Sequence, residues 1–214
     1  MRSFFSLAFA LTVLVPWTAP ARAAEKEVKL VPEEGAVEVM LLRQHSVRKE
    51  LKLTDDEAEK IHKFTSQQWK KAQHVSALGE KERDRKFDEM TKENERFLEE
   101  TLTKDQKKRL DQITLQVAGL LCVTRPHVAS KLKLTSEQKK RAPQLQKEAR
   151  DEMEELIHST SDGEKQEKLS ELRQTSKKRL LELLTDEQES EWKKMTGAPF
   201  KGDLHFDFSN EEVK

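Results

Sequence analysis

The sequence of 214 residues has few of the residues that interrupt helices or cross-link chains. It contains 6 glycines, 6 prolines, one cysteine and no tyrosine, whereas charged residues make up 37%. A single cysteine, Cys122, excludes a disulfide framework within the chain. Its neighbours Leu121 and Val123 favour a buried thiol over a bridge to another molecule. So few helix breakers in a chain rich in charged and aliphatic residues predict an all-α fold.

An excess of charge of either sign is also missing, because 40 basic side chains balance 40 acidic ones. Proteins that bind nucleic acids show a basic excess or a basic face, so we expect no nucleic-acid partner. Motifs of common active sites are missing as well: there is no Gly-x-Ser-x-Gly, no phosphate-binding glycine loop and no His-Glu-x-x-His. The carboxylates alternate with Lys and Arg, as over residues 80–85, which is typical of a solvated helix. We therefore predict no catalytic residues, no cofactor and no enzymatic activity.

Long apolar runs are confined to the N-terminus. Arg2 precedes an apolar stretch over residues 4–15, and Ala21-Arg22-Ala23 is an A-x-A cleavage signal. The pattern predicts a signal peptide over residues 1–23, cut after Ala23, and hence a periplasmic or secreted protein. An uncleaved anchor is the alternative. No later stretch is apolar enough to cross a membrane, so we expect no stable membrane insertion after cleavage. Residues 24–36 are expected to form a flexible segment.

A Leu-Thr-x-x-Gln/Glu pattern occurs four times. In a capping box of this kind, the Thr hydroxyl accepts from the backbone N–H three residues on, and the Glu or Gln accepts from the Thr N–H. Each copy therefore predicts a helix start, and we interpret the leading leucines as core contacts. The copies consist of Leu53, Thr54 and Glu57; Leu102, Thr103 and Gln106; Leu134, Thr135 and Gln138; and Leu184, Thr185 and Gln188.

The spacing of the four boxes repeats. Thr135 follows Thr54, and Thr185 follows Thr103, at offsets of roughly 80 residues that agree to within a single position. Apolar positions repeat at the same offset, which predicts a tandem duplication of a helical unit of about 80 residues. We place the first repeat at residues 37–118, the second at residues 119–198 and a C-terminal tail at residues 199–214. The tail is either a short strand-like segment that lies on the bundle or a disordered end. Of the two, we favour docking on the bundle through Phe200.

Breakers and caps place the helices. The pattern predicts a short helix over residues 37–51, interrupted near Ser46, then long helices that begin at Thr54 and near residue 80, separated by a turn at Gly79. The helix that begins at Thr103 should end before Pro126, which opens the second copy. In that copy we expect a turn over residues 159–163, and Pro143 should kink or break the helix that begins at Thr135.

A signal peptide followed by helices that open with Leu-Thr-x-x-Gln resembles the LTxxQ-motif, Spy/CpxP-like family of bacterial envelope proteins. The boxes at Leu102, Leu134 and Leu184 match that motif fully, whereas the first box has Glu57 in place of Gln. The resemblance implies a periplasmic, all-helical, ATP-independent chaperone or an envelope-stress regulator. Members with two boxes pair into a cradle-shaped dimer, which leads to the hypothesis that this chain is an internal pseudo-dimer. A homodimer is the alternative. The neutral charge and the tail after Gly197 depart from the family.

Four aromatic side chains are the candidates for binding unfolded clients: Phe64, Trp69, Phe87 and Phe97. One interpretation is that they line an apolar groove that binds unfolded proteins or an envelope partner. The other interpretation, which we favour, is that they fill a thin core. A scaffolding protein with one fixed protein partner is the alternative function.

The histidines give little support to a metal-handling protein, although a member of the resembling family is associated with zinc. None of the six histidines pairs with another at a helical spacing of three or four residues. The only local cluster of ligand-type residues is His205 with Asp203 and Asp207. We therefore predict no metal site. The histidines are His45, His62, His74, His127, His158 and His205.

Overall fold

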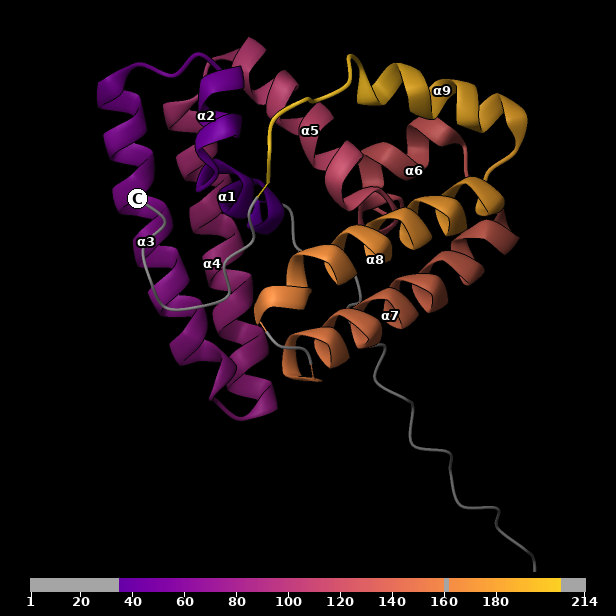
Figure 1. Cartoon of the computed structure of the whole chain (residues 1–214), viewed down its shortest axis with the longest axis horizontal. Coiled ribbons are helices and arrows are strands. Elements are labelled where there is room, and N and C mark those ends of the chain that lie inside the picture. The colour runs from indigo at the N-terminus through magenta and orange to yellow at the C-terminus, as the bar shows by residue number, and fades with distance from the viewer. Residues whose placement is uncertain (1–34, 160–161, 205–214) are drawn as a thin grey trace, which may run out of the picture.

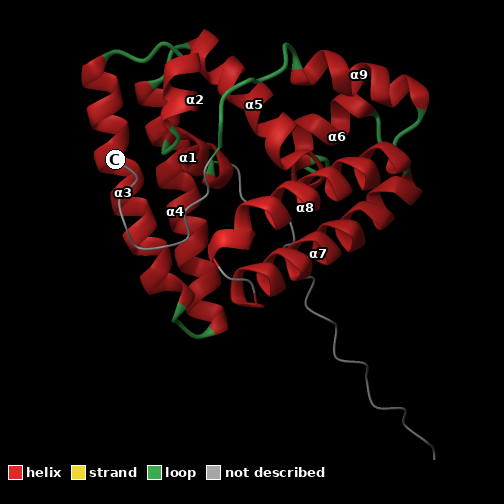
Figure 2. Ribbon diagram, in the orientation of Figure 1, coloured by secondary structure: helices red, strands yellow, loops and turns green. Residues whose placement is uncertain are grey.

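The computed structural model of the chain describes residues 35–159 and 162–204. These residues form nine helices and no strand, so the fold is all-α, as predicted (Figures 1 and 2). None of the helices in these two ranges is long and apolar enough to cross a membrane. The helices are α1 (Ala36–Leu42), α2 (His45–Glu50), α3 (Asp55–Ser76), α4 (Glu80–Thr101), α5 (Lys104–Cys122), α6 (Pro126–Leu132), α7 (Ser136–Ser159), α8 (Asp162–Leu183) and α9 (Asp186–Thr196).

Two long antiparallel hairpins dominate the molecule. Helices α3 and α4 pack side by side as one hairpin, α7 and α8 pack as the other, and α5 lies between the two halves (Figure 1). The short helices α1 and α2 cover the first half, and α6 packs against α9 in the second. Each half has its own apolar core. The core of the first half is built around Leu41, Ile61 and Leu110, and that of the second half around Leu145, Leu180 and Trp192.

The order of the helices in the first half recurs in the second. Helices α7, α8 and α9 begin after α3, α4 and α5 respectively at one common offset of roughly 80 residues, constant to within a single position. Lys52 and Lys133, which are related by the same offset, are the only described non-glycine residues with positive φ, at 53° and 52°. Each lies between a short helix and a capping box. These offsets support the duplication, which stays a prediction.

Helix α5 belongs to both halves. Its first part supplies Leu110 and Ile113 to the core of the first half, and its last part supplies Leu120 and Cys122 to that of the second. Between these parts, Ala118 has non-helical dihedral angles (φ −112°, ψ 18°), which kink the helix. At the offset that relates Lys52 to Lys133, Ala118 corresponds to Val37, the second residue of α1. The kink therefore falls where the second copy is predicted to begin. Cys122 is fully buried, which confirms the predicted environment of the thiol.

The predicted break at Pro143 is wrong, because α7 runs without interruption from residue 136 to 159. A proline removes one backbone hydrogen bond, whose acceptor here is the carbonyl of exposed Lys139. That carbonyl belongs to a solvated side of the helix. Ala142 and Leu145, on either side of the proline, are held in the core. Packing therefore offsets the cost of the proline. The predicted turn over residues 159–163 is also too long, since Asp162 already begins α8.

Candidate functional site

All four capping boxes form in the structure. Each Thr hydroxyl accepts from the backbone N–H three residues on, at 3.2 to 3.4 Å, and each Thr N–H donates back to the Glu or Gln side chain at 2.8 to 2.9 Å. The leading leucines belong to the two cores, as predicted: Leu102 and Leu134 are buried, and Leu53 and Leu184 pack against them. The motif is therefore a structural element at the start of α3, α5, α7 and α9.

The glutamines of the boxes have a second role that the capping pattern did not reveal. The Nε2 atoms of Gln106, Gln138 and Gln188 donate to main-chain carbonyls at the ends of neighbouring helices, at 3.4, 2.7 and 3.1 Å respectively. Such carbonyls have no partner within their own helix. A Gln at this position therefore caps its own helix with Oε1 and joins a second helix through Nε2. The preference for Gln over Glu in three of the four boxes was the available signal.

In the second half, the two box glutamines also bind each other. Gln138 Nε2 donates to Gln188 Oε1 at 2.6 Å, and Gln188 Nε2 donates to Gln138 Oε1 at 2.9 Å. With the cap and carbonyl bonds, each amide makes two donor and two acceptor contacts, which is its full capacity. The first half carries Glu57 and Gln106 at the equivalent positions, and a carboxylate cannot donate.

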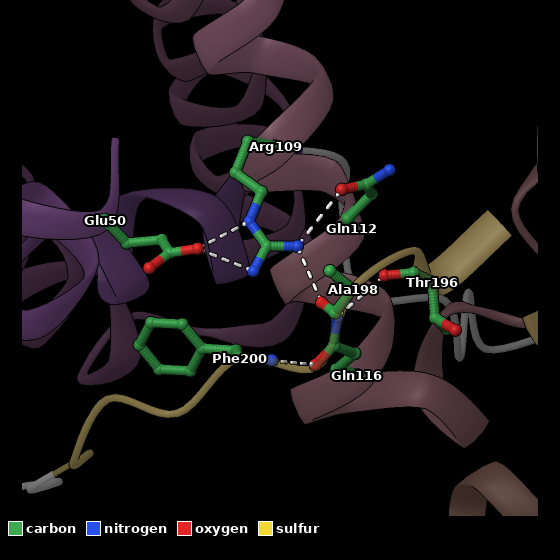
Figure 3. Close-up of polar contacts among 7 residues, drawn as sticks. All are labelled: Glu50, Arg109, Gln112, Gln116, Thr196, Ala198 and Phe200. Carbon is green, nitrogen blue, oxygen red and sulfur yellow. Dashed lines mark hydrogen bonds and ion pairs between the residues drawn. The ribbon is translucent and has the colours of Figure 1, made fainter. Parts of the chain in front are cut away.

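A C-terminal strap, which we define as residues 197–204, returns from the second half and lies across α5 toward the first half (Figure 1). Gly197 ends α9 with a positive φ of 63°. Figure 3 shows that Gln116 of α5 holds the start of the strap through its main chain. Gln116 Nε2 donates to the carbonyls of Thr196 (2.7 Å) and Ala198 (2.9 Å), and Oε1 accepts from Phe200 N–H at 2.7 Å.

Arg109, two turns earlier on α5, makes the second contact with the strap. Its Nη1 donates to the Ala198 carbonyl at 2.8 Å and to Gln112 Oε1 at 3.1 Å. Its Nε and Nη2 donate to the same carboxylate oxygen of Glu50 at 2.9 and 2.7 Å, which fixes the guanidinium (Figure 3). The strap carbonyl therefore completes an arrangement that joins α2 and α5.

The side chains of the strap add apolar contacts. Phe200 and Leu204 are half-buried and pack against the core of the first half. Ser46 Oγ donates to the Asp203 carbonyl at 2.5 Å. Docking through Phe200 is thus confirmed for residues 199–204, although this stretch is not a strand. The rest of the predicted tail, residues 205–214, lies outside the described residues.

Two of the predicted client-binding aromatics belong to the core of the first half. Phe97 is 9% exposed, and its ring stacks on that of Phe64 with centroids 3.7 Å apart and planes at 4°. Phe64 is half-buried and packs against the same core. Lys60 Nζ lies 5.7 Å from the centroid of the Phe97 ring. Core packing accounts for Phe97, so it contributes little accessible surface.

The other two aromatics lie outside both cores. Trp69 of α3 and Phe87 of α4 are half-buried. The guanidinium of Arg43 lies over the Trp69 ring, 4.6 Å from its centroid, in cation–π geometry. The sequence thus identified two core residues and two residues of a partly exposed apolar surface without distinguishing the pairs.

Ion pairs link the two helices of each hairpin. In the first, Lys71 Nζ and Gln68 Nε2 donate to Glu93 Oε2 at 2.5 and 2.8 Å. The bond from Lys71, followed by that from Gln68, holds the pKa of Glu93 below its ordinary value of 4.5. In the second hairpin, Arg179 binds both oxygens of Glu152, and this pairing raises the pKa of the arginine.

A buried ion pair joins the two halves. Arg125, immediately before α6, is 1% exposed, and its Nη1 and Nη2 donate to the two oxygens of Glu38 in α1 at 2.6 and 3.4 Å. Glu38 Oε2 also accepts from Gly35 N–H at 3.0 Å. A buried pair of this kind fixes geometry more than it adds stability. Sequence reasoning missed the pair, because 87 residues separate its members.

Residues of metal-ligand type do not gather in the described ranges, where no group of three His, Cys, Asp or Glu side chains is placed to hold an ion. His205 and Asp207, from the cluster considered above, lie outside these ranges. His127 Nε2 lies 3.8 Å from Asp111 Oδ1 on the surface.

Comparison of the chain with protein-family models, with curated proteins and with solved structures finds no match.

Proposed function

We propose that this chain is an exported helical binding protein that holds unfolded or partly folded polypeptides and needs no nucleotide. The observation that carries the proposal is the pair of half-buried aromatics, Trp69 and Phe87, on the α3–α4 hairpin outside both cores. Partly exposed aromatic surface has a free-energy cost in water unless it contacts another molecule. The resemblance of the capping boxes to LTxxQ-motif envelope proteins supports the same function.

The surroundings of these aromatics suit a client of undefined sequence. Arg43 lies over Trp69, and exposed cations such as Lys70 and Lys71 neighbour it on α3. A mixed apolar and charged surface favours weak contacts with many sequences, and its charges increase the rate of encounter. Because the net charge of the chain is balanced, it repels neither acidic nor basic clients as a whole.

The test is suppression of aggregation. Reduced lactalbumin would be allowed to aggregate while light scattering is followed, with and without the protein that begins at residue 24. We expect suppression at a few-fold molar excess, and a clear loss of suppression in the double variant Trp69→Ser, Phe87→Ser. Gln67→Ala is the matched control, because Gln67 is an exposed neighbour of Trp69 with no described contact. No suppression by the wild-type protein would refute the proposal.

Export is part of the proposal and is tested separately. Expression of the full chain in a bacterium should give a periplasmic protein whose N-terminal residue is Ala24, measured by mass spectrometry. Retention of residues 1–23 in a membrane fraction would favour the uncleaved anchor instead. Recovery of one stoichiometric protein partner from that compartment would favour the scaffolding alternative.

A further inference from the structure

The C-terminal strap is held in the manner of a bound peptide. Three hydrogen bonds join main-chain atoms of the strap to side chains of α5, two to Gln116 and one to Arg109, and Gln116 also binds the carbonyl of Thr196 at the end of α9 (Figure 3). Another hydrogen bond joins the Asp203 carbonyl to Ser46. Contacts to the main chain do not depend on the sequence of the segment that is bound. Phe200 and Leu204 then supply two apolar anchors four residues apart.

The residues that hold the strap do not belong to the repeated framework. At the repeat offset, Ser46 corresponds to His127, Arg109 to Glu191 and Gln116 to Ala198. The second half therefore carries different side chains at these three equivalent places. The first half alone carries this set, which we call the strap socket: Ser46, Glu50, Arg109, Gln112 and Gln116, with the adjoining apolar core.

We propose that the strap socket is a binding site for extended polypeptide segments that carry an aromatic side chain, and that the strap occupies it until a client segment displaces it. The inference rests on the proposed function and names the chemistry of the client. Gln116 would bind the client main chain as it binds residues 196–200, and the client's aromatic ring would replace that of Phe200.

A tethered strap can both fill this site and leave it. Because the strap is connected to α9, its effective concentration at the socket is on the order of millimolar. A free peptide of the same sequence is therefore excluded from the socket when its concentration is below that effective concentration. A long unfolded client presents many aromatic segments and contacts Trp69 and Phe87 as well, so it competes through several weak contacts at once.

Gly202 offers a way to release the strap without changing the socket. A Cβ atom at this position would lie 2.7 Å from Ser46 Cβ and would also overlap the Phe200 ring. Gly202→Ala should therefore push the strap away while Arg109 and Gln116 stay intact. Lys201→Ala is the matched control, since Lys201 is an exposed residue of the same strap with no described contact.

The experiment measures binding of a fluorescein-labelled peptide, Gly-Ala-Pro-Phe-Lys-Gly-Asp-Leu, to the full mature chain by anisotropy. We expect Gly202→Ala to bind it at least about tenfold more tightly than the wild type or Lys201→Ala. Adding Gln116→Ala to Gly202→Ala should abolish this gain. Equal, undetectable binding by all variants, with Gly202→Ala folded by circular dichroism, would overturn the inference.

A second measurement on the wild-type protein avoids dependence on the variant. Hydrogen–deuterium exchange over residues 197–204 should accelerate when reduced, carboxymethylated lactalbumin is bound. Unchanged protection of the strap in the presence of bound client would overturn the inference and leave the proposed function standing. Peptide binding without any suppression of aggregation would support the socket and refute the proposed function. A solution mass of two chains for Gly202→Ala would show that the strap of a second copy occupies the socket. That result would overturn the proposal that a client segment is the occupant.

Discussion

Replacing Gln188 by Glu tests the double role of the box glutamine. The substitution keeps the oxygen that accepts from Thr185 N–H at 2.9 Å, so the cap survives. It removes both donors, which bind the Leu132 carbonyl and Gln138 Oε1 at 3.1 and 2.9 Å. Gln188 is only 9% exposed, so water cannot fully replace these partners. The Leu132 carbonyl is left unpaired, which costs about 1–3 kcal/mol, and Gln138 Oε1 keeps only its bond from Thr135 N–H. We therefore expect a total loss of about 2–4 kcal/mol at pH 7.

Matched substitutions in the first half show how much one donor at a box position contributes to stability. Gln106→Glu removes one longer bond, to the Leu51 carbonyl at 3.4 Å, and should cost about 0.5–1 kcal/mol. If Glu57→Gln binds a carbonyl at the end of α4, as Gln138 binds the Leu183 carbonyl at the end of α8, it should be neutral or stabilising by about 1 kcal/mol. Urea unfolding followed by circular dichroism measures all three. At low pH the introduced carboxyl of the Gln188→Glu variant is protonated and can donate, so its deficit should shrink. If this variant unfolds within 0.5 kcal/mol of the wild type (roughly the spread of a neutral surface change), the double role is wrong.

The remaining predictions concern the caps, the core and pH. Thr→Ala at a box should cost about 1 kcal/mol, and unchanged thermal stability at all four positions would overturn the capping role. Phe97→Ala should cost about 3–5 kcal/mol of stability because the residue is packed in the core, whereas Phe87→Ala should cost clearly less because Phe87 is partly exposed. Equal urea midpoints for the two variants would contradict the assignment of Phe97 to the core and of Phe87 to the surface. The bond from Lys71 lowers the folded-state pKa of Glu93, so this stabilisation is complete above pH 4.5 and is lost as pH falls through the lowered value. Glu93→Gln should flatten that part of the pH profile of urea stability, and an unaltered slope would exclude Glu93 as its source. The four caps are Thr54, Thr103, Thr135 and Thr185.

Local signals predicted most of the helix limits. A capping box needs only four consecutive residues, and Gly79 and Pro126 act through their own backbone geometry. For this reason the starts of α3, α5, α6, α7 and α9 match the sequence analysis. Pro143 shows the limit of local reasoning, because the core contacts of Ala142 and Leu145 come from distant helices and outweigh a local penalty.

The contacts that organise the candidate site are long-range, which is why sequence reasoning missed them. Gln116 binds residues 80 or more positions away, and the Glu38–Arg125 pair spans 87 positions. Neither residue type nor spacing predicts such pairs in a chain with 40 basic and 40 acidic side chains. Phe200 was the exception, because an aromatic residue after a helix end in a polar chain favours docking.

The aromatic residues show a further ambiguity. Phe64, Trp69, Phe87 and Phe97 all lie on the faces of amphipathic helices, and periodicity alone treats them alike. The structure separates them, because α1 and α5 complete the core near Phe97 but do not extend it to Phe87. The length of the α3–α4 hairpin beyond the core therefore creates the surface on which the proposed function depends.

Discrimination between unfolded and native forms of one client tests the proposed function most directly. Fluorescently labelled lactalbumin, either native or reduced and carboxymethylated, would be titrated with the mature chain while anisotropy is followed. We expect saturable binding of the unfolded form, weakened by Trp69→Ser, Phe87→Ser, and no binding of the native form. Equal affinity for both forms, or binding of neither, would contradict the proposed function.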